Sequence, residues 1–318
     1  MYKRVLVPLD GSTNAAQAWP YGQRIAKATG AELEVLWIVE RFTDVARSAL
    51  NRSGPDIDGT VATSATSFDD LETVMAKLRE QAQAHLKDFI KDAQDAGLTV
   101  TTIVREGDPS DVIVEVADAS PDTLVAMGTH GRSGVARWVF GSVADRVIHH
   151  TSTSTLVVRS KEGEQRSPES ITRVIMPADG SEVSESAIPT AVEMAKALGV
   201  GITVLRSLDI GMSYTFPQTD LGDPPIPGVD KVREEGVAYA DAIAERIRSL
   251  GIADVESHAI DERPADAIVD AVGPSGDKLV VMGSHGRSGP GRWLLGSVAD
   301  VVVRHSAGPV LVVRADGE

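Results

Sequence analysis

Residues 5–12 read VLVPLDGS, and residues 174–181 read VIMPADGS. Each stretch is a short apolar run that stops at Asp-Gly-Ser, which is the pattern of a buried strand ending in a turn. A second pair of stretches follows in the same order: residues 128–148 and 283–303 are identical at 14 of 21 positions. A repeat this long indicates one domain present twice and not the short unit of a solenoid.

The apolar pattern inside each half alternates between short strands and longer helices. In the first half it predicts strands at 5–9, 32–39, 98–105, 123–127 and 155–159, and helices from 12 or 13 to 30 and at 71–96, 111–119 and 142–149. In the second half it predicts strands at 174–178, 201–208, 254–260, 278–282 and 310–314. Pro20 and Pro189 occupy matching places, so we expect a kink in the first helix of each half. Strands that alternate with helices predict a parallel sheet.

Shifts in composition predict how the two domains are joined. A polar, breaker-rich linker at 161–171 separates a first domain at 1–160 from a second at 172–318. The first domain carries an insertion at 41–70, and the second carries a proline-rich stretch at 216–228. Both follow the second strand, at the edge where open α/β sheets bind ligands, so each is either a surface loop or a lid.

The composition excludes several classes of function. The 318 residues include no cysteine, which excludes disulfides, thiolate metal sites and cysteine nucleophiles. The net charge is −15 and no stripe of Lys and Arg offsets it, so we expect no nucleic-acid partner. No apolar stretch is long enough to span a bilayer. These features predict a cytoplasmic protein with no membrane partner.

A glycine motif of the form Gly-x2-Gly-x9-Gly-Ser follows the fourth predicted strand of each half. Its members are Gly128, Gly131, Gly141 and Ser142 in the first half, and Gly283, Gly286, Gly296 and Ser297 in the second. Glycine lets a backbone approach a phosphate closely, and the last two residues of each motif begin a helix. The N–H groups of residues 141–143 and 296–298, together with the helix dipole, are therefore expected to bind an anion.

This motif differs from two better-known phosphate loops. The chain has no Gly-x4-Gly-Lys-Ser/Thr sequence, and no Gly-x-Gly-x-x-Gly opens a helix after its first strand. That strand ends instead in Asp10, and its counterpart ends in Asp179. A carboxylate at this place faces the crevice of an open α/β sheet. It is expected either to contact a ligand or to cap the turn.

Several charged and titratable residues lie near the motif. Arg132 and Arg287 either reach the phosphates or are solvated loop charges. No acid or nucleophile stands at a telling spacing from a histidine, and no carboxylate pair suggests catalysis. His149, His150 and His305 lack metal-ligand partners in the sequence. We therefore predict no catalytic residue and no metal held by protein ligands alone.

The two glycine motifs, with Pro-x-Asp-Gly-Ser at the start of each half, resemble the ATP-binding branch of the universal stress protein family. The resemblance covers both halves apart from the linker, the insertion and the termini. It implies two tandem Rossmann-like domains of the adenine nucleotide alpha hydrolase type, each a five-stranded parallel sheet with helices on both faces. It also implies that residues 156–158 and 311–313 pair, which makes the two halves a pseudo-dimer.

The same resemblance assigns site residues by position. Contacts with adenosine would come from Pro8, Asp10 and Val39, and from Pro177, Asp179 and Leu208. Contacts with ribose and phosphates would come from Gly128, Gly131, Gly141, Ser142 and Val143, and from Gly283, Gly286, Gly296, Ser297 and Val298. The implied ligand is ATP, with Mg²⁺ held through the phosphates.

The resemblance implies a regulatory protein of the stress response, with a homodimer and an unidentified regulatory protein as partners. Two alternatives stay open: a slow Mg²⁺-dependent ATPase, and an interaction scaffold whose sites are vestigial. One departure from the family pattern separates the halves. Residues 107–109 are Gly-Asp-Pro, whereas their counterparts at 262–264 are Glu-Arg-Pro. A backbone position that prefers glycine is strained or rearranged by another residue, so we predict weaker binding in the second half.

Overall fold

The computed structural model describes residues 2–39, 80, 84–130, 141–160, 167–210, 228–284 and 295–314. The insertion at 41–70 and nearly all of the stretch at 216–228 lie outside the described residues. So do four of the proposed site residues: Gly131, Arg132, Gly286 and Arg287.

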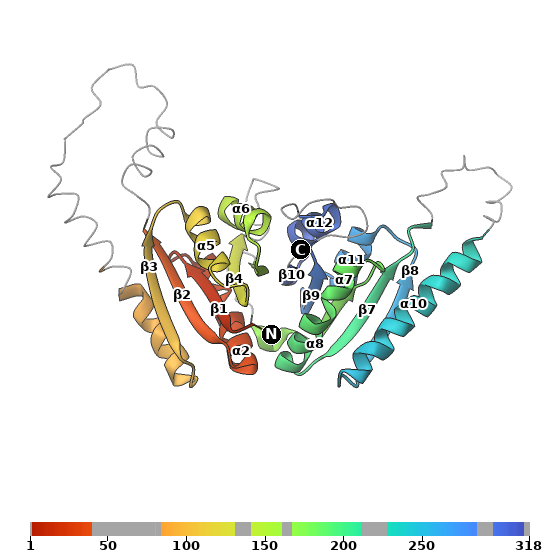
Figure 1. Ribbon diagram of the computed structural model, residues 1–318, viewed down its shortest axis with the longest axis horizontal. Helices are drawn as coiled ribbons and strands as arrows, with labels where there is room; N and C mark the ends of the chain where they lie inside the picture. The colour runs from red at the N-terminus through yellow and green to blue at the C-terminus, as the bar shows by residue number, and fades with distance from the viewer. Residues whose placement is uncertain are drawn as a thin grey trace, which may run out of the picture.

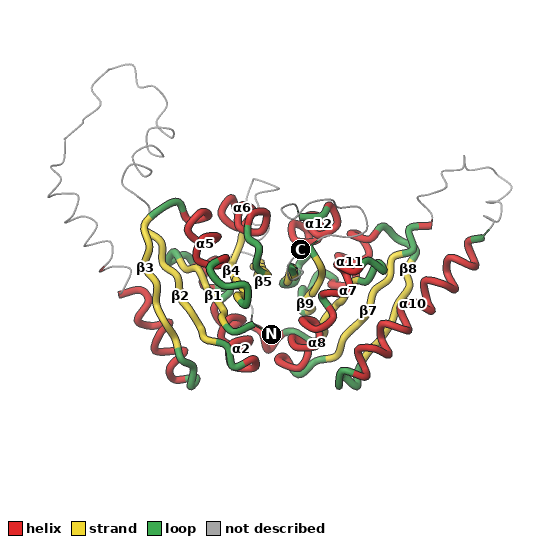
Figure 2. The backbone as a smooth tube through the Cα atoms, in the orientation of Figure 1, coloured by secondary structure: helices red, strands yellow, loops and turns green. Residues whose placement is uncertain are grey.

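The described strands form one ten-stranded sheet in the order β3-β2-β1-β4-β5-β10-β9-β6-β7-β8 (Figures 1 and 2). The first half contributes β1 Arg4–Leu9, β2 Glu32–Val39, β3 Val100–Glu106, β4 Thr123–His130 and β5 Ser154–Ser160. The second contributes β6 Arg173–Pro177, β7 Gly201–Ser207, β8 Val255–Ile260, β9 Lys278–Gly283 and β10 Val310–Val313. Strands within each half pair in parallel. The predicted fold class is therefore confirmed.

The halves meet at an antiparallel pair of their last strands. In this pair Leu311 lies opposite Leu156, and Val310 lies opposite Val157. These side chains are at most 1% exposed. The predicted pairing of the last strands is confirmed, and it turns two sheets into one.

The first helix of each half differs from the kinked helix predicted around Pro20 and Pro189. The structure has two helices in each place: α1 Thr13–Ala16 and α2 Trp19–Thr29, then α7 Glu182–Ser186 and α8 Ile188–Leu198. Each proline lies in the first turn of the second helix, where a backbone N–H has no partner within the helix. Proline therefore begins a new helix here and does not bend an old one.

Helices cover both faces of the sheet, because both faces of its strands are apolar. Val5 and Val7 pack in a cluster with α2 and α8, whereas Leu6 points to the other face. That second face is covered by α5 Pro109–Asp118 and α6 Ser142–His150 in the first half, and by α11 Pro264–Val272 and α12 Ser297–His305 in the second. Residues 84–95 and α10 Val229–Ser249 add helices on the outer strands.

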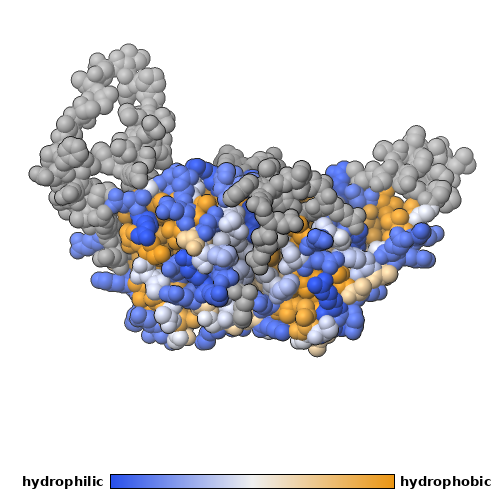
Figure 3. All heavy atoms as spheres, viewed as in Figure 1, coloured by the Kyte–Doolittle hydropathy of each residue, from blue (hydrophilic) through white to orange (hydrophobic). Residues whose placement is uncertain are grey.

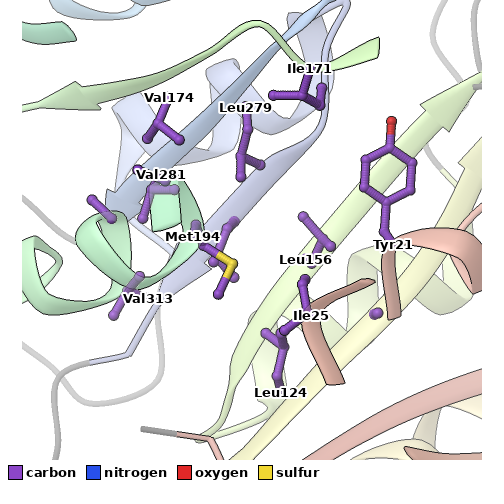
Figure 4. Packing of buried hydrophobic residues seen from close by; sticks show 14 of the residues in the cluster. Tyr21, Ile25, Leu124, Leu156, Ile171, Val174, Met194, Leu279, Val281 and Val313 are labelled. Atoms are coloured by element: carbon purple, nitrogen blue, oxygen red, sulfur yellow. The ribbon is translucent and has the colours of Figure 1, made fainter. Parts of the chain in front are cut away.

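The largest core cluster runs through both halves without a break. Figure 4 shows Ile25 and Leu156 from the first half beside Met194 and Leu279 from the second. The helices α2 and α8 also contact each other across the join. In the space-filling view, hydrophilic and hydrophobic residues are interspersed over the described part of both halves (Figure 3).

Candidate functional site

The candidate residues gather at the carboxyl ends of the strands. In each half the first strand lies between strands whose connections run in opposite directions: β1 between β2 and β4, and β6 between β7 and β9. Open α/β sheets bind ligands in the crevice at such a switch point. Asp10 directly follows β1 and Asp179 is the second residue after β6, while α6 and α12 begin after the neighbouring strands. Residues far apart in the sequence are thus brought to one edge.

The second half has a cavity of about 410 Å³ at this edge. The volume lies in the range of small-molecule sites. The cavity is lined by all of the described candidates of that half: Pro177, Asp179, Leu208, Gly283, Gly296, Ser297 and Val298. Sequence reasoning missed further lining residues, among them Ser184, Arg206, Ile268 and Ser284. An alignment of the two halves would have drawn attention to Arg206, because its counterpart is a tryptophan.

One end of the cavity is the N-terminus of a helix. Gly296 is the N-cap of α12, with φ −64° and ψ 151°, and it makes no side-chain cap hydrogen bond. Gly141 is the N-cap of α6 in the same way. The first N–H groups of a helix have no partner within it, and they carry the positive end of its dipole. The N-termini of α6 and α12 therefore have the chemistry of an anion site.

The first N–H of each expected group already has an acceptor. The Gly296 N–H donates to the Ser284 carbonyl oxygen at 2.8 Å, and the Gly141 N–H donates to the Thr129 hydroxyl at 3.3 Å. In each half, the first of the three expected N–H groups is therefore already hydrogen-bonded within the protein. The next two, from the Ser and Val that follow, begin the helix.

Gly128, near the end of β4, and Gly283, the last residue of β9, each lie against the backbone of another element. A Cβ at Gly128 would lie 1.8 Å from the Asn14 carbonyl oxygen, and one at Gly283 would lie 2.5 Å from the Val183 carbonyl oxygen. Real Cβ atoms do not approach backbone this closely. Both glycines are required for packing of α1 and α7, whatever they contribute to a ligand.

The aspartates close the turns that follow the first strands. Asp10 accepts from the Ser12 N–H at 2.8 Å, and Asp179 accepts from the Ser181 N–H at 2.9 Å and from its hydroxyl at 2.6 Å. These bonds use one carboxylate oxygen, Oδ1, in each residue. An ionised carboxylate offers about four acceptor positions, so the cap and a ligand contact are compatible.

The two adenosine-side candidates on the second strands have different surroundings. Val39 is 5% exposed and its side chain belongs to the core, while its carbonyl oxygen accepts from the Gly107 N–H at 3.2 Å. The Leu208 N–H donates to the Ile260 carbonyl oxygen at 2.8 Å, and Leu208 lines the cavity. Of these two residues, Leu208 is the one that the structure places in the lining of a cavity.

Three titratable residues meet where the halves join. Ligand atoms of Asp145, His149 and Asp300 lie within 4.8 Å of one another. The sequence did not reveal this set, because Asp300 comes from the other half. Arg304 already neutralises the carboxylates: it donates to Asp300 at 2.8 Å and to Asp145. This arrangement is an ion-pair network between α6 and α12, which face each other in Figure 1.

Three comparisons with known proteins bear on the identity of the chain. The sequence model of the Universal stress protein family matches residues 1–159 and 170–314. A universal stress protein of Mycolicibacterium smegmatis is 31% identical over 239 residues, which are 74% of this chain and 75% of that protein. A solved universal stress protein from Archaeoglobus fulgidus aligns over 99% of both chains, with a TM-score of 0.68 and 20% identity.

The match to the family covers nearly all of the chain and recurs once in each half. The described helices contain none that is long and apolar enough to cross a membrane. The duplicated sheet, the edge cavity and the sequence match all agree with membership of this family. The chain belongs to the universal stress protein family, in a tandem form with two family domains.

Proposed function

We propose that each half binds ATP at the carboxyl edge of its strands, with Mg²⁺ held through the phosphates. The second-half cavity carries this proposal. It has an uncapped helix N-terminus at one end, strand-end residues at the other, and a volume of about 410 Å³. The helix end suits phosphates, since the N–H groups and the dipole both favour negative charge. The first-half residues at matching positions supply the same helix terminus.

We further propose that the protein acts in the cytoplasm as a regulator of the stress response rather than as a fast enzyme. Among the lining residues that the structure describes, the titratable ones are Asp179 and Arg206. A general base must lie within hydrogen-bonding reach of the attacking water. Asp179 is the sole described candidate, and it also closes its own turn. Hydrolysis slower than about one turnover per second follows from this arrangement.

The first test is to denature the protein as purified and to identify and count the nucleotide released. About two ATP per chain would support both sites. Release of no nucleotide, together with no binding on addition of Mg-ATP, would overturn the proposal.

A pair of substitutions makes the test specific to the helix ends. Asp at Ser142 and Ser297 places a negative charge where a phosphate would lie, yet it favours the helix through the dipole. We therefore expect the S142D/S297D chain to fold and to lose ATP. The matched control is S142N/S297N, which is neutral and similar in size and should retain ATP. Equal retention by both variants would contradict phosphate binding at these helices.

A further inference from the structure

The strand register pairs each lining residue of the second half with a residue of the first. Pro8 lies beside Leu36, and Pro177 lies beside Leu205. The next residues along the second strands, Trp37 and Arg206, therefore occupy the same position. The two candidate sites can therefore be compared residue by residue.

One end of the candidate site is the same in both halves. The helix terminus is Gly-Ser-Val in each, and each fourth strand carries the pair Met-Gly at or near its end. The other end differs, at the second strand and the first short helix. Ala15, Trp37 and Ile38 in the first half are replaced by Ser184, Arg206 and Ser207 in the second. This end of the site is apolar in the first half and polar in the second, whereas the phosphate end is the same in both.

The residues that contact Trp37 and Arg206 also differ between the halves. Trp37 stacks on His85 in the first half, with ring centroids 5.7 Å apart and an interplanar angle of 29°. In the second half the Arg206 guanidinium lies 5.3 Å from the centre of the Tyr239 ring. His85 and Tyr239 are themselves counterparts, since each lies twelve residues before the glycine that follows its helix, Gly97 or Gly251. Both members of this contact therefore differ between the halves.

Arg206 is held in place by further contacts. Its Nη1 donates to the Ala178 carbonyl oxygen at 3.4 Å, next to Asp179. The Tyr239 hydroxyl beneath it donates to Glu185 at 3.1 Å, and Glu185 also accepts from Arg246 at 3.0 Å. Burial is the main cause that raises the pKa of Tyr239 to about 12, so Tyr239 stays neutral at physiological pH. A guanidinium fixed in this way has a defined position, and Arg206 is among the residues that line the cavity.

We infer that Arg206 is the specificity-determining residue of the second-half site, and that it selects a purine nucleotide whose base presents two adjacent acceptors. The O6 and N7 edge of guanine has this pattern, and arginine binds it through two parallel hydrogen bonds. The inference rests on the proposed function, since it requires a nucleotide in the cavity. A site built to hydrogen-bond its ligand discriminates strongly, whereas apolar surface such as Trp37 and Ile38 discriminates weakly. The two halves thus differ in which purine nucleotide they prefer, although both accept ATP.

The test uses the full chain with one site blocked at a time. The S142D chain reports the second site, and the S297D chain reports the first. We would measure the dissociation constants of Mg-ATP and Mg-GTP for each by calorimetry. The S142D chain is expected to prefer GTP by about tenfold or more, the value of one bidentate base contact. The S297D chain is expected to show no such preference.

Two variants at Arg206 then separate charge from geometry. R206W/Y239H recreates the first-half counterparts and should bring the ATP-to-GTP ratio to that of the first site. R206K keeps the charge but loses the fork, and it should also lose most of the preference. Full retention of the GTP preference by R206K would overturn the inference, and R206K also decides the matter if the double variant does not fold.

The outcomes separate this inference from the proposed function. If the blocked chains and the unblocked protein all failed to bind ATP and GTP, both the inference and the proposed function would be wrong. Binding of ATP at both sites with the same ATP-to-GTP ratio would remove the inference alone, and the proposed function would stand.

Discussion

The helices α5 and α11 occupy the same place beside the candidate sites, yet they begin differently. Asp108 caps α5 by accepting from the Ser110 N–H at 3.0 Å and the Asp111 N–H at 3.2 Å. Arg263 stands at the N-cap of α11 and makes no side-chain cap hydrogen bond. The preceding residue differs as well: Gly107 has φ +154°, a conformation that its counterpart Glu262 does not share. The predicted departure between the halves is thus a rearranged loop.

The join between the halves shows the opposite behaviour. Arg159 donates to the Arg304 carbonyl oxygen at the end of α12, and its counterpart Arg314 donates to the Ile148 carbonyl oxygen near the end of α6. Each arginine therefore crosses to the last helix of the other half. The duplicated chain has kept this pair of contacts across its join, whereas the caps of α5 and α11 beside the sites differ. The following predictions test this difference, from the largest expected effect to the smallest.

The largest effect is expected at Gly128 and Gly283, the glycines near the ends of the fourth strands. Gly128→Ala would force a Cβ against the Asn14 carbonyl oxygen, a backbone atom that cannot rotate away. We expect a loss of about 3 kcal/mol in the free energy of unfolding, measured with urea. Gly283→Ala meets its obstacle at 2.5 Å and not 1.8 Å, so it should cost less. Equal costs would show that the two halves pack alike here.

The second prediction concerns Arg304, whose counterpart in the first half is His149. Arg304→Gln leaves Asp145 and Asp300 close together without their cation, so we expect a loss of about 1.5 kcal/mol at pH 7. His149→Gln is the matched control. His149 is 3.8 Å from Asp145 and 3.9 Å from Asp300, and its removal should cost less. A larger cost for H149Q than for R304Q, measured by urea denaturation at pH 7, would reverse our ranking.

The third prediction concerns the cap of α5. Asp108→Ala should reduce stability by about 1 kcal/mol at pH 7, the usual contribution of an N-cap. A hydrogen bond from the Ser110 hydroxyl is the main cause that lowers the pKa of Asp108 in the folded state. The contribution of the ionised group is therefore present above pH 3.9, the unfolded value, and is lost as pH falls through the lower folded pKa. A difference between D108A and the parent that does not change with pH in this range would contradict the assignment.

The smallest effect is a gain in the second half. Arg263→Asp gives α11 the cap that α5 already has, and it replaces a cation at a helix N-terminus by an anion. We expect stability to rise by about 0.5 kcal/mol, visible as a small increase in Tm. Arg263→Ala removes the cation without adding a cap and serves as control. If R263A gains as much as R263D, the missing cap is not what distinguishes the two helices.

Local patterns in the sequence predicted most of the fold. Apolar runs that stop at a turn placed the ends of the described strands to within three residues, because a buried strand needs such a run whatever its partners are. The positions of Pro20 and Pro189 were seen, but proline at the start of a helix and proline inside one look alike in a sequence. Only the structure decided that each begins a new helix.

The sequence by itself determined the duplication, the fold class and the residues at the phosphate end, since glycine and helix-start patterns are local and occur twice. Tertiary structure alone decided which distant side chains meet. It placed Arg206 on the Tyr239 ring, and it brought Asp300 of one half to His149 of the other. Such contacts join residues on different elements, and their partners are set by the register of the strands and the packing of helices upon them. No pattern along the chain records which side chain a given residue will face.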